Sequence, residues 1–416
     1  MMRALLRPKF DLVQDAADVY VVNACTVTSL AERKARQSIH RIRRESPDAQ
    51  IVLIGCLADA VLQGLTAVEE VELYAGNAWK GRIEEVIERA LAGQRGPLPP
   101  IPPLPCSEER ITGHEGRVRA FLKIQDGCEL FCTYCRTKQV RGATRFKPVA
   151  AAVSEARRLV ENGYPEIVLT GINLANYTRP EGGLSRLVCA MLEIKDLRRL
   201  RLGSVNPAGI TEDLLQAFSE DRRACPHFHI PLQSGDDAVL ARMKRGYDMS
   251  YYRSRIALVR RYIPEATFGT DVIVGFPGEG QDAFARTCAV IEDLEFVNLH
   301  IFRYSPRRGT PAATFPNSIS ERIKSERTKR LQTLWAGSRQ RLFEERVGSC
   351  EEVLIEERQG DCARGYTRGY IDTVVRGEGK MNVGDEIAAR ITRASGDHLE
   401  GISSDGTDPH RDHVAG

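Results

Sequence analysis

Three cysteines fall within eight residues of one another in this chain. Cys128, Cys132 and Cys135 stand in the stretch DGCELFCTYCRTKQVRG (126–142) with C-x3-C-x2-C spacing. Thiols this close together can bind a metal ion, form a disulfide or hold an iron–sulfur cluster.

These three alternatives differ in the number of ligands that they need. A structural zinc ion usually takes four protein ligands, and no fourth Cys or His lies near the three cysteines in the sequence. A disulfide would leave one cysteine over. A [4Fe-4S] cluster held by three thiolates leaves one iron without a protein ligand, which a small molecule can chelate. The ligand count therefore favours the cluster, with structural zinc as the alternative.

Composition fits a protein whose thiols stay reduced. The chain has 416 residues, 42% of them hydrophobic, and eleven cysteines. Its first twenty residues, MMRALLRPKFDLVQDAADVY, contain no long apolar segment, so no secretory signal is expected. No apolar run approaches the ~20 residues of a spanning helix. We expect a cytoplasmic protein without a membrane segment, in which clustered cysteines bind metal or take part in catalysis.

The segments that must position the three cysteines form a repeating pattern. Six apolar strand-like runs alternate with helical stretches, about 30 to 40 residues apart, which is typical of βα units. The sequence predicts a partial (β/α)6 TIM-type barrel with functional groups at the carboxyl ends of its strands. The cysteines directly follow the first run. The six runs are 121–127, 166–173, 199–205, 227–234, 267–278 and 296–305.

Two more cysteines follow strands near the N-terminus. Residues 18–23 and 50–56 read as buried parallel strands with a helix (31–46) between them. Cys25 and Cys56 lie at the carboxyl ends of these strands, where open α/β sheets bind ligands.

Composition changes along the chain indicate the domain boundaries. We expect an α/β domain over 1–93, a proline-rich linker over 94–116 and the barrel over 117–340. A charged helix (318–345) leads to short strands with glycine turns, which predict a small β-barrel over 341–405. Residues 406–416 are expected to form a disordered tail.

The motifs taken together resemble a known family. C-x3-C-x2-C after the first strand of a βα barrel is similar to the radical S-adenosylmethionine (SAM) signature. The domain order resembles the radical SAM methylthiotransferases over nearly the whole chain, with a TRAM-like C-terminal domain, and most closely the MtaB subgroup. The segments that carry the resemblance are VVNACTVT (21–28), IGC (54–56), DGCELFCTYC (126–135), HIPLQSGDDAVLARMKRGY (229–247), TDVIVGFPGE (270–279), YSPRRGTPAA (304–313) and GYTRGYIDTVV (365–375).

The resemblance implies two cofactors bound through the first cysteine set. Cys128, Cys132 and Cys135 would hold a [4Fe-4S] cluster whose open iron binds the methionine part of SAM. Arg245 is a candidate partner for the methionine carboxylate. The full set of residues that the resemblance places near SAM is Tyr134, Gly171, Ser204, Asn206, Gln233, Ser234, Arg245, Asp271, Val274 and Gly275.

The resemblance also implies a second [4Fe-4S] cluster, held by three cysteines of the N-terminal domain. Cys25 and Cys56 match two of them, and none of the 24 residues before Cys25 is a cysteine. We therefore expect this chain to begin inside the first helix of that domain, with an incomplete ligand set. Further departures from the family pattern are Ala24, the segment Arg136–Gln139 and Asn206.

Members of the MtaB subgroup add a methylthio group to C2 of N6-threonylcarbamoyladenosine beside the anticodon of tRNA. They use a 5′-deoxyadenosyl radical and SAM as methyl donor. The resemblance therefore predicts a monomeric enzyme that acts on the tRNA anticodon stem-loop and takes electrons from a flavodoxin or ferredoxin. The alternatives are methylthiolation of an aspartate in a ribosomal protein and an impaired RNA-binding homologue without a complete second cluster.

A tRNA substrate requires phosphate contacts from Lys and Arg. Basic residues that could make them crowd the N-terminal helix, follow the three cysteines and follow the sixth strand. We expect most phosphate contacts there, because residues 341–416 are acidic overall, with a possible local basic face at Arg364, Arg368 and Arg376. The first three groups are Arg33, Lys34, Arg36, Arg41, Arg43 and Arg44; Arg136, Lys138, Arg141, Arg145 and Lys147; and Arg307 and Arg308.

Overall fold

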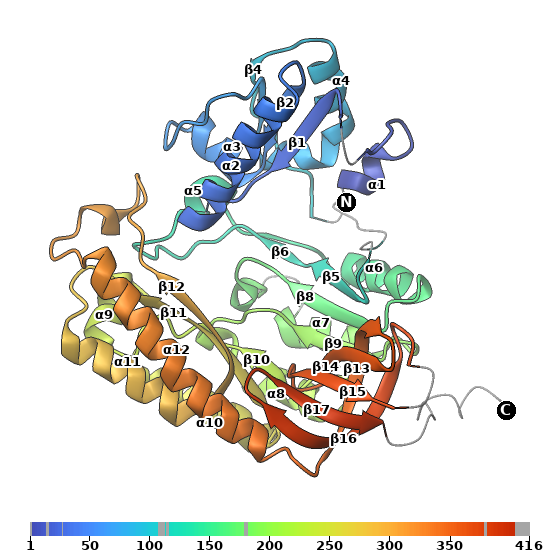
Figure 1. Cartoon of the computed structure of the whole chain (residues 1–416), viewed down its shortest axis with the longest axis vertical. Coiled ribbons are helices and arrows are strands. Elements are labelled where there is room, and N and C mark those ends of the chain that lie inside the picture. The colour runs from blue at the N-terminus through green and yellow to red at the C-terminus, as the bar shows by residue number, and fades with distance from the viewer. Residues whose placement is uncertain are drawn as a thin grey trace. The chain divides into compact units, whose positions relative to one another are not determined.

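The computed structural model describes residues 2–13, 16–26, 28–106, 113, 116–178, 182–377 and 381–403. The chain forms two compact units (Figure 1). Unit 1 comprises residues 1–112, 126–147 and 305–315, and unit 2 comprises 113–125, 148–304 and 316–416. The segment with the three clustered cysteines thus belongs to the same unit as the N-terminal domain.

Unit 1 is built on a parallel sheet of order β1-β2-β3-β4. Its first two strands confirm the predicted strand pair. The fourth strand comes from the expected linker, so the start of that linker is part of the sheet. The strands are β1 (Val19–Asn23), β2 (Gln50–Ile54), β3 (Leu73–Ala75) and β4 (Gly96–Pro97); the helices are α1 (Met2–Leu6), α2 (Ser29–Glu45), α3 (Cys56–Leu62), η1 (Asn77–Arg82) and α4 (Ile83–Leu91).

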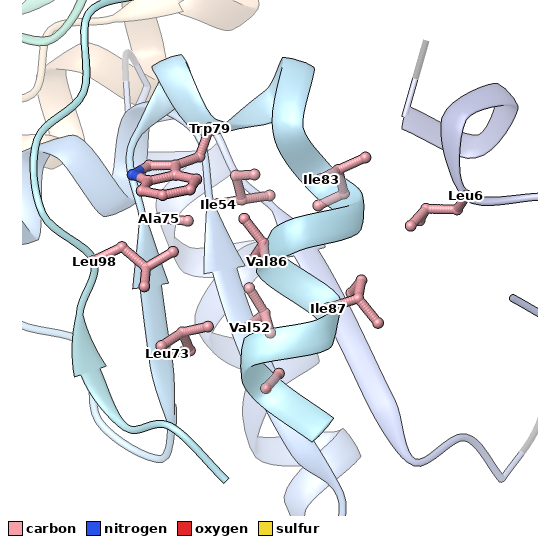
Figure 2. Packing of buried hydrophobic residues seen from close by; sticks show 11 residues of the cluster. Leu6, Val52, Ile54, Leu73, Ala75, Trp79, Ile83, Val86, Ile87 and Leu98 are labelled. Atoms are coloured by element: carbon pink, nitrogen blue, oxygen red, sulfur yellow. The ribbon is translucent and has the colours of Figure 1, made fainter. Parts of the chain in front are cut away.

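The two faces of this sheet bury separate apolar clusters. On one face, Val52 and Ile54 of β2 pack toward Ile83, Val86 and Ile87 of α4 (Figure 2). These side chains are at most 6% exposed. On the other face, side chains of β2 pack with residues of α2 and α3. Burial on both faces explains why β2 reads as a continuous apolar run.

The remaining parts of unit 1 are short. They are β6 (Gln125–Asp126), α5 (Thr137–Arg141), β7 (Arg145–Phe146) and η4 (Pro311–Thr314). Val140 of α5 packs with Cys56 and Ala60 of α3. Helix α5 follows the clustered cysteines and α3 begins with Cys56, so this packing joins the two cysteine-bearing regions.

Unit 2 confirms the predicted barrel of six parallel strands. They form two three-stranded sheets, β5-β8-β9 and β10-β11-β12, joined by isolated bridges such as Ser204 with His229. The strands are β5 (Arg119–Lys123), β8 (Glu166–Thr170), β9 (Arg199–Leu202), β10 (His227–His229), β11 (Thr267–Val274) and β12 (Phe296–Arg303). The helices are α6 (Val149–Glu161), η2 (Leu174–Asn176), α7 (Gly183–Leu192), η3 (Pro207–Gly209), α8 (Glu212–Ser219), α9 (Asp237–Met243), α10 (Met249–Tyr262) and α11 (Gln281–Leu294).

The C-terminal part of unit 2 confirms the predicted small β-barrel. Helix α12 (Glu321–Glu344) leads into five strands that close in the order β13-β14-β15-β17-β16. They are β13 (Cys350–Gln359), β14 (Cys362–Thr367), β15 (Asp372–Arg376), β16 (Glu386–Ser395) and β17 (His398–Ser403).

A buried ion pair joins the two barrels of unit 2. The guanidinium of Arg199, in β9, donates from Nε to Glu386 of β16 at 2.6 Å. Arg199 also donates to the carbonyl oxygens of Tyr366 and Glu352 at 3.0 and 2.8 Å. Arg199 is fully buried, so these contacts balance its charge away from water.

None of the helices within the described ranges is long and apolar enough to span a membrane.

Candidate cysteine sites and cofactor-binding strands

Cys25 and Cys56 lie at the carboxyl ends of adjacent parallel strands. The backbone N–H of Ala24 donates to Ile54 at 3.0 Å, and that of Leu57 donates to Ala24 at 3.1 Å. These bonds hold the two strand ends together. The structure therefore brings together the two N-terminal cysteines of the sequence analysis, with Cys56 buried and Cys25 exposed.

A glycine makes this close approach possible. Gly55, between β2 and Cys56, has φ of +102°, a conformation that L side chains rarely adopt. A Cβ atom there would lie 2.8 Å from Asn23 Oδ1 and 3.0 Å from the Ala24 carbonyl oxygen. Glycine therefore lets the backbone turn from β2 directly into the helix that Cys56 starts.

Polar groups surround the Cys56 sulfur. Arg141 Nε lies 3.1 Å from Cys56 Sγ, and Asn77 Nδ2 lies 3.4 Å from it. A hydrogen bond with Cys25 and the positive charges of Arg141 and Lys80 lower the pKa of the Cys56 thiol, although burial opposes the shift. The thiolate is the form that binds metal. Two adjacent cysteines, one with its thiolate favoured, fit two ligands of an iron–sulfur cluster.

The C-x3-C-x2-C loop begins at another position that requires glycine. Gly127 has φ of +77°, and a Cβ there would lie 2.1 Å from the Ala143 carbonyl oxygen. The N–H of Cys128 donates to Gly142 at 3.3 Å, and that of Cys135 donates to Cys132 at 3.1 Å. These bonds fold the segment into a compact loop.

All three cysteines of this loop are half-buried, as is Tyr134. The N–H of Thr137 points at Cys135 Sγ from 3.4 Å. Three accessible thiols in one loop, one of them receiving a backbone donor, fit the ligand set of a cluster with one open iron.

Asp126 connects the two cysteine regions of unit 1. Its carboxylate forms ion pairs with Arg141 at 3.3 Å and Arg145 at 3.1 Å, and accepts from the N–H of Gly127 at 2.9 Å. Contacts thus run from Cys56 through Arg141 to Asp126, two residues before Cys128. From the sequence, Arg141 is predicted only as a phosphate contact, because spacing alone does not show its contact with Cys56 across 85 residues.

Arg136 is buried and does not follow the expectation of a basic surface after the cysteines. It is 4% exposed and donates to Thr26 Oγ1 at 3.2 Å, the Leu65 carbonyl at 3.2 Å and the Arg308 carbonyl at 2.9 Å. Arg307 forms an ion pair with Glu32 at 3.1 Å beside it. These arginines hold the cysteine loop, the N-terminal domain and residues 305–315 together.

The other proposed phosphate contacts divide into exposed and engaged residues. Lys147 is 1% exposed, and Arg145 pairs with Asp126. Arg36 and Arg43 form ion pairs with Glu32 and Glu72, while Arg364 pairs with Asp372 and Arg368 contacts Glu352. The exposed basic residues of these groups are Arg33, Lys34, Arg41, Arg44, Arg308, Arg364 and Arg376.

The residues expected near SAM, apart from Tyr134, lie in unit 2, mostly just beyond the carboxyl ends of strands. Gly171 follows β8, where a Cβ would lie 2.8 Å from Gln125 Oε1. Ser204 and Asn206 follow β9, and Asn206 Oδ1 accepts from the N–H of Ala208 at 3.4 Å. Gly171, Ser204 and Asn206 thus follow two neighbouring strands of one sheet.

Gln233 and Ser234 follow β10 in a constrained backbone. Gln233 has φ of +69°, which is uncommon for a residue with a side chain. Its N–H donates to the Asp271 carbonyl at 2.8 Å, and its own carbonyl accepts from Ile273 at 2.9 Å. Ser234 is fully buried, and its Oγ accepts from the N–H of Asp236 at 3.3 Å. Backbone strain of this kind is concentrated at functional sites.

Arg245 is buried beside this segment. Its Nε donates to Tyr247 Oη at 3.1 Å, and Tyr247 Oη donates to the Leu232 carbonyl at 3.0 Å. These two hydrogen bonds connect the Arg245 guanidinium through Tyr247 to the backbone after β10 and so fix its position.

The last predicted residues lie at the end of β11. Val274 is fully buried. Gly275 has φ of +73° and donates its N–H to Glu279 Oε2 at 2.6 Å, so it begins the turn that the glycines and proline of Gly-Phe-Pro-Gly (275–278) predict.

Asp271 stands within β11 between two histidines that the sequence analysis did not single out. His229 Nε2 and His300 Nδ1 each lie 3.1 Å from Asp271 Oδ1. The sequence contains a signal for this cluster, because His229 and His300 occur in two of the six apolar runs. Side chains alternate along a strand, so every second residue of such a run lies on the same face of the sheet.

Comparisons with known proteins agree with these features. Residues 122–291 match the radical SAM superfamily, and residues 1–76 match the uncharacterized protein family UPF0004. The threonylcarbamoyladenosine tRNA methylthiotransferase MtaB of Chlamydia pneumoniae is 33% identical over 92% of this chain and 89% of its own length. That of Thermotoga maritima is 34% identical over 91% of this chain and 87% of its own length.

A solved structure supports the fold independently. The radical SAM methyltransferase TsrM from Kitasatospora setae superposes with a TM-score of 0.54 at 15% identity, over 72% of this chain and 66% of its own. The chain thus spans about two thirds of that protein. The superfamily match and the two relatives agree, and this chain belongs to the MtaB group of radical SAM methylthiotransferases.

Proposed function

We propose that this enzyme adds a methylthio group to C2 of N6-threonylcarbamoyladenosine beside the anticodon of tRNA. The relatives that share about a third of its residues are named for this modified base. The observation that carries the proposal is the arrangement of unit 1, in which Cys25 and Cys56 share a compact body with the loop of Cys128, Cys132 and Cys135. A methylthiolation needs a radical source and a sulfur source, and two cysteine sites can serve one each.

The proposed reaction replaces the C2–H bond of the adenine by a C–S bond that carries a methyl group. The clusters and SAM would supply the hydrogen-abstracting radical, the sulfur atom and the methyl group, with electrons from a reduced flavodoxin or ferredoxin. The chain supplies the ligands and the positions. Cys128, Cys132 and Cys135 would bind the cluster that takes SAM, and Cys25 and Cys56 would contribute to a second cluster.

Residues of unit 2 would bind SAM in this proposal. Gln233 and Ser234 present polar groups from a rigid backbone, and Gly171 and Ser204 lie at neighbouring strand ends. Arg245, fixed by Tyr247, would meet the methionine carboxylate. Tyr134, Asn206, Asp271, Val274 and Gly275 complete the proposed set.

The substrate assignment is tested on nucleosides. Mass spectrometry of digested bulk tRNA should show loss of 2-methylthio-N6-threonylcarbamoyladenosine in a deletion strain and its return with the wild-type gene. A gene with Cys128, Cys132 and Cys135 changed to alanine should not restore it. An unchanged nucleoside profile in the deletion strain would refute the proposal. Modification of a purified ribosomal protein instead of tRNA would establish the alternative substrate.

The second cluster is tested by counting iron. After anaerobic reconstitution the wild-type chain should hold about eight irons, and the triple alanine variant of the clustered cysteines about four. A C25A/C56A variant should also hold about four. A wild-type protein with about four irons, unaffected by C25A/C56A, would exclude the second cluster.

A further inference from the structure

A cluster of two histidines and one aspartate lies on the β10-β11-β12 sheet. Asp271 belongs to the proposed SAM-binding set, whereas His229 and His300 have no role in the proposed chemistry. His229 Nε2 and His300 Nδ1 both lie 3.1 Å from the same oxygen, Asp271 Oδ1. The two imidazole rings are stacked, with their centres 5.3 Å apart. Each of the three residues comes from a different strand, so the parallel register of the sheet aligns them.

The cluster faces away from the helices that cover this sheet. Thr270 of β11 lies on the helix side, where the hydroxyl oxygen of Tyr252 in α10 is 3.4 Å from its Oγ1. Side chains alternate along a strand, so Asp271 points to the opposite face. Gly269 shares that face, and a Cβ there would lie 2.8 Å from His229 Nδ1. The glycine therefore leaves room for the His229 ring.

Asp271 fixes the orientation of the His300 ring. An ionised carboxylate only accepts hydrogen bonds, so Nδ1 of His300 is the donor and Nε2 points away from Asp271. The hydrogen bond to Asp271 raises the pKa of His300, although burial opposes this. The His300 side chain is 61% exposed, and His229 and Asp271 are 14% and 22% exposed. The result is a hydrogen-bond donor that is anchored on one side and open on the other.

An exposed aromatic ring stands next to this donor. Phe302, two residues farther along β12, is 41% exposed, and its ring centre lies 6.4 Å from that of His300 in an edge arrangement. Aromatic faces stack on bases that leave the RNA stack. The strand therefore presents a surface for a base beside a donor for an anion.

N6-threonylcarbamoyladenosine has this combination of groups. Its adenine has a π face, and its side group carries the carboxylate of threonine. We propose that His300, positioned by Asp271 and His229, binds the threonyl carboxylate and makes the enzyme selective for the threonylcarbamoylated base. The proposal rests on the proposed function and assigns His300 a role in specificity, with Asp271 as its positioning residue.

Kinetics with two RNA substrates test the assignment. The first RNA is an anticodon stem-loop with N6-threonylcarbamoyladenosine, and the second carries the methyl ester of the same threonyl group. Wild-type reconstituted enzyme should show a KM for the ester RNA about tenfold higher, as expected from the loss of one charge-assisted hydrogen bond. His300→Ala should raise the KM for the acid RNA by a similar factor and that for the ester RNA very little. The KM for SAM should not change.

Two further variants sharpen the result. Asp271→Asn keeps the side-chain volume but loses the charge that orients His300, so it should raise the KM for the acid RNA and leave the iron content unchanged. His398→Ala removes a histidine paired with Asp397 in β17, at 2.8 Å, and is the matched control with wild-type values.

Several outcomes would overturn the assignment. If His300→Ala raised the KM for both RNAs by the same factor, or raised the KM for SAM, His300 would not be the residue that binds the threonyl carboxylate. Stoichiometric zinc or iron(II) bound by the wild-type chain and lost in His229→Ala would make the cluster a metal site instead. If the wild-type enzyme methylthiolates neither RNA, the proposed function fails as well; if it modifies both with the same KM, only the role of His300 is refuted.

Discussion

Arg141 Nε lies 3.1 Å from Cys56 Sγ, and the same guanidinium pairs with Asp126 at 3.3 Å. Arg141 closes the helix that follows the clustered cysteines, while Cys56 follows a strand of the N-terminal sheet. One side chain therefore contacts both a candidate ligand of the second cluster and the strand that leads to the first. The hydrogen bond directs positive charge at a sulfur that is expected to carry negative charge.

Replacing Arg141 should therefore affect the second cluster first. In a chain whose Cys128, Cys132 and Cys135 are alanine, we expect about four irons after reconstitution, and Arg141→Ala should lower this number. Arg141→Lys keeps the charge but not the geometry and should have an intermediate effect. Iron and sulfide analysis measures both. Arg44→Ala, at an exposed position of α2, is the control, and equal iron contents in all variants would contradict the role of Arg141.

Alanine variants of Arg136 and Arg44 should have opposite effects, one on protein stability and the other on RNA binding. Arg136→Ala removes the donor to Thr26 Oγ1 and to the Leu65 and Arg308 carbonyl oxygens and should destabilise unit 1 by about 3 kcal/mol. Arg44→Ala should leave stability unchanged, because the side chain is exposed, and should reduce the slope of log affinity against log salt for tRNA by about one. Chemical denaturation and salt-dependent binding assays measure the two effects. A loss of RNA affinity in Arg136→Ala at full stability would restore the expectation of a basic surface there.

Removing the carboxylate of the buried ion pair of unit 2 should lower stability more than removing the carboxylate of an exposed pair. Glu386→Ala leaves the fully buried Arg199 with only the more distant carboxylate of Glu166, at 3.8 Å, and should cost about 3 kcal/mol of unfolding free energy. The exposed pair Arg261–Glu212 is the control, since Glu212→Ala should cost at most about 1 kcal/mol. Urea unfolding measures both, and similar small losses would show that Arg199 reaches water when its partner is removed.

The Asp271 and His300 pair predicts a pH dependence of stability. Burial alone would raise the pKa of Asp271, but the hydrogen bonds from His229 and His300 lower it, and Asp271 raises the pKa of His300. The aspartate's contribution is present above its ordinary value of 3.8 and is lost as the pH falls through its lowered pKa. The histidine's contribution is present below its ordinary value of 6.5 and is lost as the pH rises through its raised pKa.

The stability difference between wild type and Asp271→Asn should therefore be largest between these two ordinary values, near pH 5. We expect about 1 kcal/mol there, reduced from the full pairing energy because His300 is exposed to solvent. Thermal unfolding of both proteins from pH 3 to pH 9 measures the difference. A stability difference that stays constant across this pH range would mean that protonation of Asp271 and His300 is not coupled to folding.

The long apolar strands, the (β/α)6 barrel and the cysteine loop could be predicted from the sequence. The predicted strands are apolar runs long enough to be recognised alone, whereas β3 and β4 of unit 1, of three and two residues, are too short to be recognised. The three clustered cysteines are close in the chain. Their chemistry follows from local spacing, which a linear sequence records. The small C-terminal β-barrel was likewise predicted from short strands between glycine turns, and the structure shows that it has five strands.

Which charged residues face water and which bind the segments of unit 1 to one another became visible only in the folded structure. Arg136 and Arg44 read alike in the sequence, yet one is buried among carbonyl oxygens and the other is exposed. The contact of Arg141 with Cys56 and the alignment of His229, Asp271 and His300 join residues 29 to 85 positions apart. Such contacts depend on helix packing and strand register, because side chains distant in the chain meet only when the backbone between them is folded.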